Sequence, residues 1–405
     1  MRANLTEVGP SGLIYSLGLL LGLLGIFFSP FVLSLGTAFM LISLLISYRD
    51  IKAVSWQVWI IYLFPVLLVL TDLFRYTDPT TVNQKLLLAF GFTCMGIASI
   101  VQSKRITSIK PMLFVAVLAV VLIIDIVSVW NYLANKEEID QLLLQSKSIE
   151  IFGGLHHIHF GIINAICICI LCFHILIEKK WRTFLSITAA IVLVICFHIL
   201  SSRTGLVAFY SSVLVVLGLY TVKEKAYKQG IIGLIVVVAV NIAAYNLSSS
   251  FRSKLANSVE DVESWDSPEA VNYKSMGMRL EAYKICLEMI KDKPLFGFGA
   301  SKAMPQMQVY YESTNSALYK ENRIGPHNQF LEYGIKYGAL GMLFLLIFFL
   351  YWLKASLKPL NYFVLLLVLL LAVSMQFESL LERQVSIYLT AVVFPLIKGK
   401  ELGEY

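Results

Sequence analysis

Long apolar runs recur along this sequence and constrain its fold more than any other feature. A helix that crosses about 30 Å of hydrocarbon needs about 20 predominantly apolar residues. Segments of this kind lie at 11–29, 31–47, 56–73, 86–102, 111–134, 155–177, 183–200, 204–221, 230–247, 334–353, 360–376 and 385–397. With 58% hydrophobic and 15% charged residues, the composition excludes an ordinary soluble domain. We predict an all-α, polytopic transmembrane helix bundle with about twelve spans.

One hydrophilic stretch divides the runs. Residues 1–247 hold nine predicted spans, residues 248–333 form a large extracytoplasmic loop, and residues 334–405 hold three more spans. The first run lacks a small-residue cleavage site before the next run, which favours a retained span over a signal peptide.

The hydrophilic loop has two parts. Residues 248–273 are polar and Ser-rich, a composition compatible with partial order. Beyond them, apolar residues recur at spacings of three and four until Pro294, at Met276, Leu280, Tyr283, Leu287 and Ile290. This period predicts an amphipathic helix that lies beside the bundle, against the membrane surface.

The positions of Lys and Arg in the short loops predict the orientation. Roughly sixteen cations fall on one side of the bundle and roughly six on the other, which predicts that both termini are cytoplasmic. The long loop, the 201–203 hairpin, the 137–154 loop and the 378–383 turn then share the outer face. The net charge of +7 is explained by cations at helix ends, so we expect membrane lipid and no nucleic acid as a partner.

Two arginines are candidates for binding an anion. Arg203 lies between two apolar runs, where a guanidinium needs water, a carboxylate or a phosphate as its partner. It is either a snorkelling side chain at a helix end or a ligand for a lipid-linked phosphate. The planar guanidinium group suits the second role, because it can bind two phosphate oxygens at once. Arg279 opens the amphipathic helix. A solvated surface position is the usual explanation there, but the helix dipole disfavours a cation at a helix start and so raises the case for an anionic partner.

Histidines and carboxylates supply further candidates. His327 follows Pro326, and an imidazole on a wet outer surface can act as the general base that deprotonates a hydroxyl, although an ordinary packed histidine is the common case. Glu378, Glu382 and Arg383 form a charged turn that can orient an arginine or bind sugar hydroxyls.

A metal or nucleotide site is not expected. His156, His157 and His159 lie close in sequence without a Cys, Asp or Glu ligand nearby, so packing or contact with an acceptor is favoured over metal binding. The sequence has no P-loop, no metalloprotease helix and no Asp-x-Asp pair, which argues against an ATP-driven pump and a nucleotide-sugar enzyme.

Three patches together resemble the O-antigen ligase and polymerase superfamily of bacterial envelope glycosyltransferases. The first is Ser202–Gly205 before a helix, and the second runs from Arg279–Tyr283 through Met289–Gly299. The third is His327–Glu332, followed by Gly334, Gly338 and Gly341. The resemblance covers the second half of the chain well, whereas the first half matches only in its succession of helices.

The resemblance implies a fold and a reaction. It implies a metal-independent, cofactor-free transferase of the membrane GT-C type in the bacterial cytoplasmic membrane, with its active site facing the periplasm or the cell exterior. The donor would be a glycan on undecaprenyl diphosphate, and the acceptor a glycan or a lipid-linked molecule such as lipopolysaccharide. Direct attack would invert the anomeric carbon.

Roles for single residues follow from the same resemblance. Arg203 and Arg279 would hold the diphosphate and stabilise its developing charge, and His327 would remove the acceptor proton. Further substrate contacts are expected from Tyr283, Asn328 and Glu332 within these patches and, independently of the resemblance, from Glu382 and Arg383 in the charged turn. Many relatives carry Trp a few residues after the loop arginine, Arg279, where this chain has Tyr283.

Three functions stay open at this point. The chain is a ligase that delivers a finished glycan to another acceptor, the reading we favour, or a polymerase that joins repeat units. A transporter or flippase for lipid-linked sugars is the alternative of another class. Transporters often have related halves, and no internal repeat is visible in this sequence.

Overall fold

The computed structural model describes residues 8–75, 78–144, 147–177, 183–263, 270–357 and 360–398. Every predicted apolar segment lies on a helix: α1 (Gly9–Phe28), α2 (Pro30–Ile46), α4 (Trp56–Leu70), α5 (Pro79–Gln102), α6 (Lys110–Ala134), α8 (His157–Cys172), α9 (Phe184–Leu200), α10 (Arg203–Lys223), α11 (Tyr227–Leu247), α15 (Gln329–Leu357), α16 (Tyr362–Phe377) and α17 (Gln384–Lys398). The described residues form no strand, so the all-α prediction is confirmed.

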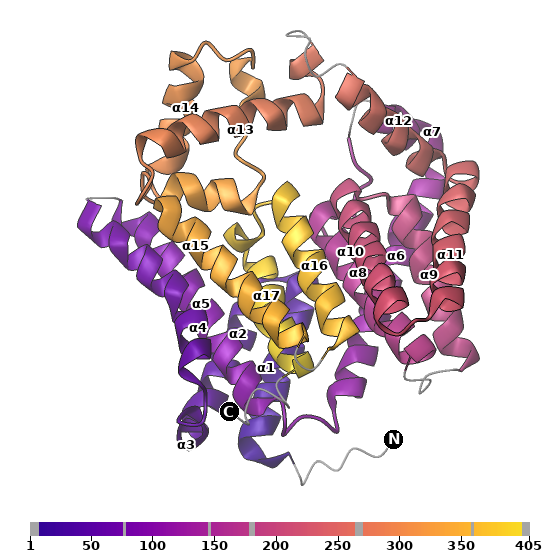
Figure 1. The fold of residues 1–405 in the computed structure, drawn as a ribbon, viewed down its shortest axis with the longest axis horizontal. Coiled ribbons are helices and arrows are strands. Elements are labelled where there is room, and N and C mark those ends of the chain that lie inside the picture. The colour runs from indigo at the N-terminus through magenta and orange to yellow at the C-terminus, as the bar shows by residue number, and fades with distance from the viewer. Residues whose placement is uncertain are drawn as a thin grey trace.

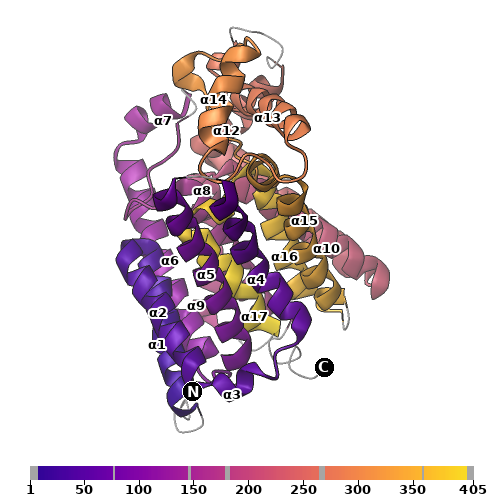
Figure 2. The ribbon, with the colours of Figure 1, turned by 90° about the vertical axis from the view of Figure 1, so that its left-hand side faces the viewer.

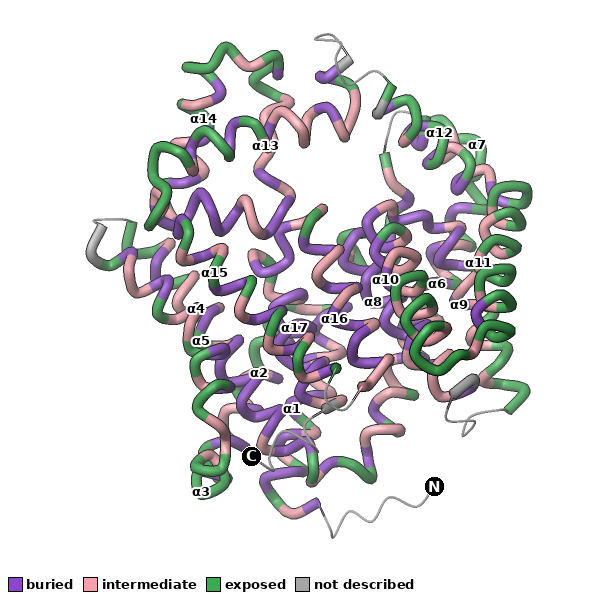
Figure 3. The backbone as a smooth tube through the Cα atoms, viewed as in Figure 1, coloured by how far each residue is buried: buried purple, intermediate pink, exposed green. Residues whose placement is uncertain are grey.

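The number of membrane spans stays a prediction. Among the described residues, eight helices are long and apolar enough to cross a membrane. The other four predicted spans are shorter apolar helices: α2, α9, α16 and α17. Helix α11 is apolar and exposed along nearly its whole length (Figure 3), as expected of a helix that faces lipid.

The polar helices gather at one end of the bundle. These are α7 (Lys136–Leu144), α12 (Ser249–Glu263), α13 (Ser275–Asp292) and α14 (Ala303–Ser313). Figures 1 and 2 show them together at the end opposite the short helix α3 (Tyr48–Ile51). Segments that we assigned to one face, 137–144 and the long loop, therefore lie at one end. Which side of the membrane this end faces is still a prediction.

The long loop is more ordered than its composition indicated. Helix α12 covers most of the Ser-rich part, and α14 lies beyond Pro294, in a stretch for which we predicted no helix. Residues 264–269 are outside the described part of the chain.

The loop also has a small core of its own. Helix α13 forms, as predicted, but it buries Ala282, Ile285, Cys286 and Met289 against α14 and α15, whereas the predicted contact residue Leu287 is 52% exposed. The buried face therefore differs from the predicted one, although the predicted residue Ile290 does pack against this core.

Glycines fasten the loop to α15. The Phe298 backbone N–H donates to the Ile335 carbonyl at 2.8 Å, beside a break in α15 at Gly338, whose φ is 62°. A Cβ atom on Gly338 would lie 2.4 Å from the Leu295 carbonyl carbon, so any larger residue forces the two backbones apart. The Gly297–Gly299 turn is thus a docking element for α15.

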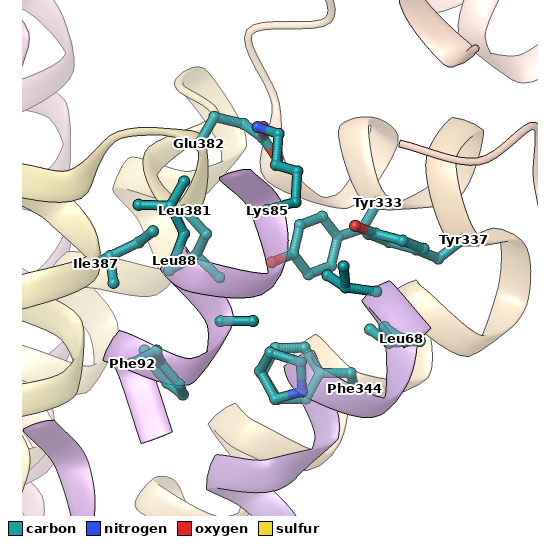
Figure 4. Close-up of a pocket in the computed structure, with 13 residues that line it drawn as sticks. Leu68, Lys85, Leu88, Phe92, Tyr333, Tyr337, Phe344, Leu381, Glu382 and Ile387 are labelled. Atoms are coloured by element: carbon teal, nitrogen blue, oxygen red, sulfur yellow. The ribbon is translucent and has the colours of Figure 1, made fainter. Parts of the chain in front are cut away.

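A buried ion network ties the first turns of α15 to α5 and to the turn before α17. The Lys336 ammonium pairs with Glu332, one helical turn away, and lies 2.8 Å from the Glu382 carboxylate. Glu382 also pairs with Lys85, and Figure 4 shows these two side chains. Although burial raises the pKa of Glu382, Lys336 and Lys85 lower it below its usual range. The adjoining cavity of about 30 Å³ is too small for a sugar ring and is comparable to the volume of a water molecule.

Replacement of Lys336 by methionine should destabilise the fold strongly. Lys336 is 3% exposed, and its loss leaves two buried carboxylates without their shared cation. Breaking a buried pair in this way typically costs about 3–5 kcal/mol of unfolding free energy. Unfolding in detergent or nanodiscs measures the effect. The control is Lys284→Met, which breaks a pair whose lysine side chain is 66% exposed and should change little. Equal stability of the two variants would contradict the structural role of the network.

Candidate functional site

The carboxyl-terminal end of α16 brings together residues from two distant segments. Its last carbonyls have no partner within the helix. Arg279 Nη1 donates to the Phe377 carbonyl at 3.1 Å, and the Tyr283 hydroxyl and Asn328 amide donate to the Gln376 carbonyl at 3.2 and 3.0 Å. A helix end of this polarity favours a nearby cation. Helix α13 and the start of α15 therefore meet at this point.

His327 lies at the same end. Its Nδ1 is 3.2 Å from Glu378 Oε2, and Glu378 is the first residue after α16. His327 has a φ of 41°, a left-handed conformation that is uncommon outside glycine and concentrated at functional sites. The imidazole is 36% exposed, and its Nε2 has no hydrogen-bond partner among the described residues. The ring is thus held at one nitrogen and accessible at the other.

Glu378 is suited to orient this ring. Burial alone raises the pKa of Glu378, but the hydrogen bond and charge of His327 and the charge of Arg279 lower it below its usual range. The ionised carboxylate fixes the tautomer with the proton on Nδ1, which leaves Nε2 as a proton acceptor.

Asn328 has a structural task beside His327. Its Oδ1 accepts hydrogen bonds from the Phe330 and Leu331 backbone N–H groups at 2.9 and 3.1 Å, so it caps the first turn of α15. Its amide holds the end of α16, as described above. A contact between Asn328 and substrate stays a prediction.

The three-histidine segment adjoins this group. The His156 ring lies 4.5 Å from the His157 ring and 5.7 Å from the His159 ring, and His159 Nδ1 is 2.8 Å from the Ser386 hydroxyl. Burial lowers the pKa of His156, and the charges of Arg383, His327 and Arg279 lower it further against the opposing effect of Glu378. Within the described ranges, no group of three or more His, Cys, Asp or Glu side chains is placed to hold a metal.

Arg203 lies at the start of α10, in a second cationic group. Its Nη1 is 2.8 Å from Asp261 Oδ2, and Asp261, on α12, is 1% exposed. Arg203 Nη2 is buried and has no hydrogen-bond partner among the described residues. Gly205 and Gly161 bring α10 and α8 into backbone contact, since a Cβ on Gly205 would lie 3.1 Å from the Gly161 carbonyl carbon. The hairpin before Arg203 is thereby held against α8.

Helix α12 has a buried polar stripe with partners on two sides. Its members lie at helical spacing: Lys254, Asn257 and Asp261, exposed by 6%, 7% and 1%. Asp261 pairs with Arg203. The Asn257 amide instead donates to the Leu143 carbonyl, and the Lys254 ammonium to the Lys147 carbonyl. Burial and the Arg203 charge lower the pKa of Lys254 to about 8, while Asp261 opposes this shift. These residues were missed in the sequence, where their spacing on one face of a polar segment is the signal that identifies them.

The predicted site residues thus fall into three places. Arg279, Tyr283, His327 and Asn328 meet at the end of α16, whereas no ion pair or hydrogen bond between described residues joins Arg203 to them. The two groups are linked by His157, which lies within electrostatic range of both Lys254 and Arg279. Glu332 and Glu382 belong to the buried ion network, and Arg383 is exposed near His156.

Comparison with known protein families gives a match over part of the chain. Residues 188–346, which include Arg203, Arg279 and His327, match the O-antigen ligase family. The resemblance to this superfamily is thereby confirmed over these residues. Glu378 and the three-histidine segment lie outside the matched region. The apolar helices and this match together indicate a multi-pass membrane protein.

The chain is also similar to an uncharacterized protein of Haemophilus influenzae. The two are 30% identical over 194 residues. The matched region covers 47% of this chain and 46% of the relative, so the chain spans about half the length of the curated protein that it matches.

Proposed function

We propose that this protein is an O-antigen ligase-like glycosyltransferase, which moves a glycan from an undecaprenyl diphosphate donor to an acceptor hydroxyl. The family match suggests a ligase- or polymerase-type transferase. The observation that carries the proposal is the imidazole of His327, held by Glu378 beside the Arg279 guanidinium. A base and a cation at one point suit a reaction in which a hydroxyl loses a proton and an anion leaves.

The transfer needs no covalent intermediate. The acceptor oxygen attacks the anomeric carbon while the bond from that carbon to the diphosphate oxygen breaks, and the acceptor proton passes to His327 Nε2. Glu378 stabilises the imidazolium that forms, as a carboxylate does in catalytic triads. Arg279 stabilises the charge on the departing diphosphate. The attack is direct and inverts the anomeric carbon, and the protein's own cations supply the charge that a metal supplies in other transferases.

In this proposal, Arg203 is a second residue, besides Arg279, that binds the donor diphosphate. Its pair with Asp261 uses Nη1 and leaves the buried Nη2 without a partner among the described residues. The diphosphate takes this position, next to Lys254 on α12. Arg203 and Arg279 then hold the phosphates from two sides. In this proposal, the end of the bundle that carries α7, α12, α13 and α14 lies on the outer face of the cytoplasmic membrane.

Mass analysis of envelope glycans after deletion of the gene tests the proposal. Intact chains that are not attached to their acceptor support a ligase, which we favour, and shortened chains support the polymerase. Movement of lipid-linked sugar by the purified protein, with no new glycosidic bond, would instead support a transporter. Glycans unchanged in length and attachment would contradict both transferase readings.

Donor affinity should fall as the pH rises through about 8. Lys254 has a pKa of about 8 and is protonated at neutral pH. Its ammonium donates to the Lys147 carbonyl and lies within electrostatic range of Arg203, Asp261 and His157. Loss of its proton above pH 8 removes one positive charge near the diphosphate and weakens its binding. The KM for the lipid donor, measured from pH 7 to 9.5, reports this step. Lys254→Met should show a raised KM without the step, whereas an unchanged pH profile in that variant would assign the titration to another group.

A further inference from the structure

An open cavity of about 570 Å³ lies between the end of α6 and the segment 148–157. Its volume falls within the range of about 300–1,000 Å³ that is usual for small-molecule sites. Polar groups from both walls line it: Ser128, Asn131, Ser148, Glu150, His156 and His157. The resemblance and the family match assign no role to these walls, which precede residue 188.

The loop that forms one wall is pinned in place. Ile149 and Ile151 are 2% and 7% exposed and anchor it in the core, and the Phe152 backbone N–H donates to the Ser128 hydroxyl at 2.9 Å. Glu150 and Phe152 line the cavity together with these isoleucines but are exposed, Phe152 by 51%. The cavity is therefore preformed.

The lining fits a saccharide better than a phosphate. A sugar ring has a hydroxyl-rich edge, which hydroxyl, amide and carboxylate groups bind, and an apolar face, which packs against an aromatic ring such as Phe152. Glu150 is the only carboxylate among the described lining residues, and the arginines of the candidate site do not line the cavity. The Lys254 ammonium reaches this wall, 3.5 Å from the Ser148 hydroxyl, but it already donates to the Lys147 carbonyl. A diphosphate would have to compete with that bond and would meet the negative charge of Glu150.

The position of the cavity connects it to the reacting groups. His156 lines the cavity and lies within electrostatic range of His327, Arg279 and Glu378. We propose that this cavity is a saccharide-binding subsite, which holds sugar residues of a substrate next to the bond that forms or breaks. This inference rests on the proposed function, because the reacting bond is the one assigned there.

Protection of an introduced thiol tests the subsite without relying on turnover. The native cysteines are buried, except Cys172, which is half-buried, so Phe152→Cys adds one accessible thiol. Its labelling by a charged maleimide should slow about tenfold when ligand is present at ten times its Kd. The probes are the oligosaccharide released from the cell's own lipid-linked glycan by mild acid, and the intact lipid-linked glycan.

The control is Tyr273→Cys, at a residue of the polar loop that is 71% exposed and does not line the cavity. Protection of the Phe152→Cys variant by the free oligosaccharide supports a subsite that binds sugar alone, and protection by only the lipid-linked form assigns it to the donor glycan. Absence of protection by either probe, or equal protection of both variants, overturns the proposal.

Kinetics separate the subsite from the reaction. Phe152→Ala and Glu150→Ala should raise the KM for the glycan substrate about 3–10-fold and leave kcat unchanged. If the protein transfers no glycan but the thiol is protected, the proposed function fails and the subsite stands. If transfer proceeds and both variants have the same KM for the glycan substrate as the unsubstituted protein, the subsite proposal is wrong and the proposed function is retained.

Discussion

Replacement of His327 by alanine should lower the rate of glycan transfer by about 10²–10⁴-fold, the usual contribution of a general base. The KM for the donor should change little, because Arg203 and Arg279 remain. His327 is half-exposed and contacts Glu378 at a single hydrogen bond, so the fold should keep its stability. Transfer from lipid-linked donor by purified protein in nanodiscs, together with the melting temperature, measures both quantities.

Glu378→Gln is the companion variant. Glutamine keeps the size of the side chain but loses the charge that orients the imidazole, so kcat should fall by less than in His327→Ala, with the KM unchanged. Because the pKa of Glu378 is lowered in the folded protein, the unsubstituted enzyme loses this orienting charge only as the pH falls through that lowered value, and Glu378→Gln should lack this acidic step. Full activity of His327→Ala would exclude His327 as the base.

The helices of the bundle could be predicted because length and apolar composition decide them. Any segment that is apolar over a membrane's thickness must satisfy its backbone groups internally, and a helix does so. Helices α12 and α14 have no such signal. Tertiary contacts hold these helices in place, such as the Asp261 pair with Arg203; helical spacing can mark Asp261 as one of a set on α12, but it does not identify Arg203 as its partner.

The site was only partly predictable for a similar reason. Arg279 and His327 carry chemistry that the sequence shows directly, and their motifs stand within the matched region. The partner of His327 lies 51 residues away, beyond α15 and α16, and only the fold brings the two together. Glu332 was expected to bind substrate as part of the His327 motif, and Glu382 as part of the charged turn; their pairs with Lys336 could not be read from the sequence, and their contact with substrate stays a prediction.

The end of α16 explains why a loop and a bundle form one site. Helix α13 and the first residues of α15 attach to the carbonyls of Gln376 and Phe377, and the next residue, Glu378, holds the base. A displacement of this end would move the cation and the base together, so their spacing is kept. We expect this spacing, more than the loop's own core, to determine the rate.

Replacement of Arg279 by alanine should lower kcat by about 10²–10³-fold, the usual loss when one preorganised donor to a developing anion is removed. Arg279→Lys should recover part of the rate, since lysine keeps the charge but lacks the planar fork. Tyr283 and Asn328 still hold the end of α16 in both variants, so the melting temperature should change little.

The control is Lys284→Ala, which removes an exposed cation from the same helix and should leave kcat unchanged. An equal fall in Arg279→Ala and Lys284→Ala would show that Arg279 acts through the general charge of α13, and an unchanged kcat in Arg279→Ala would remove it from the reaction.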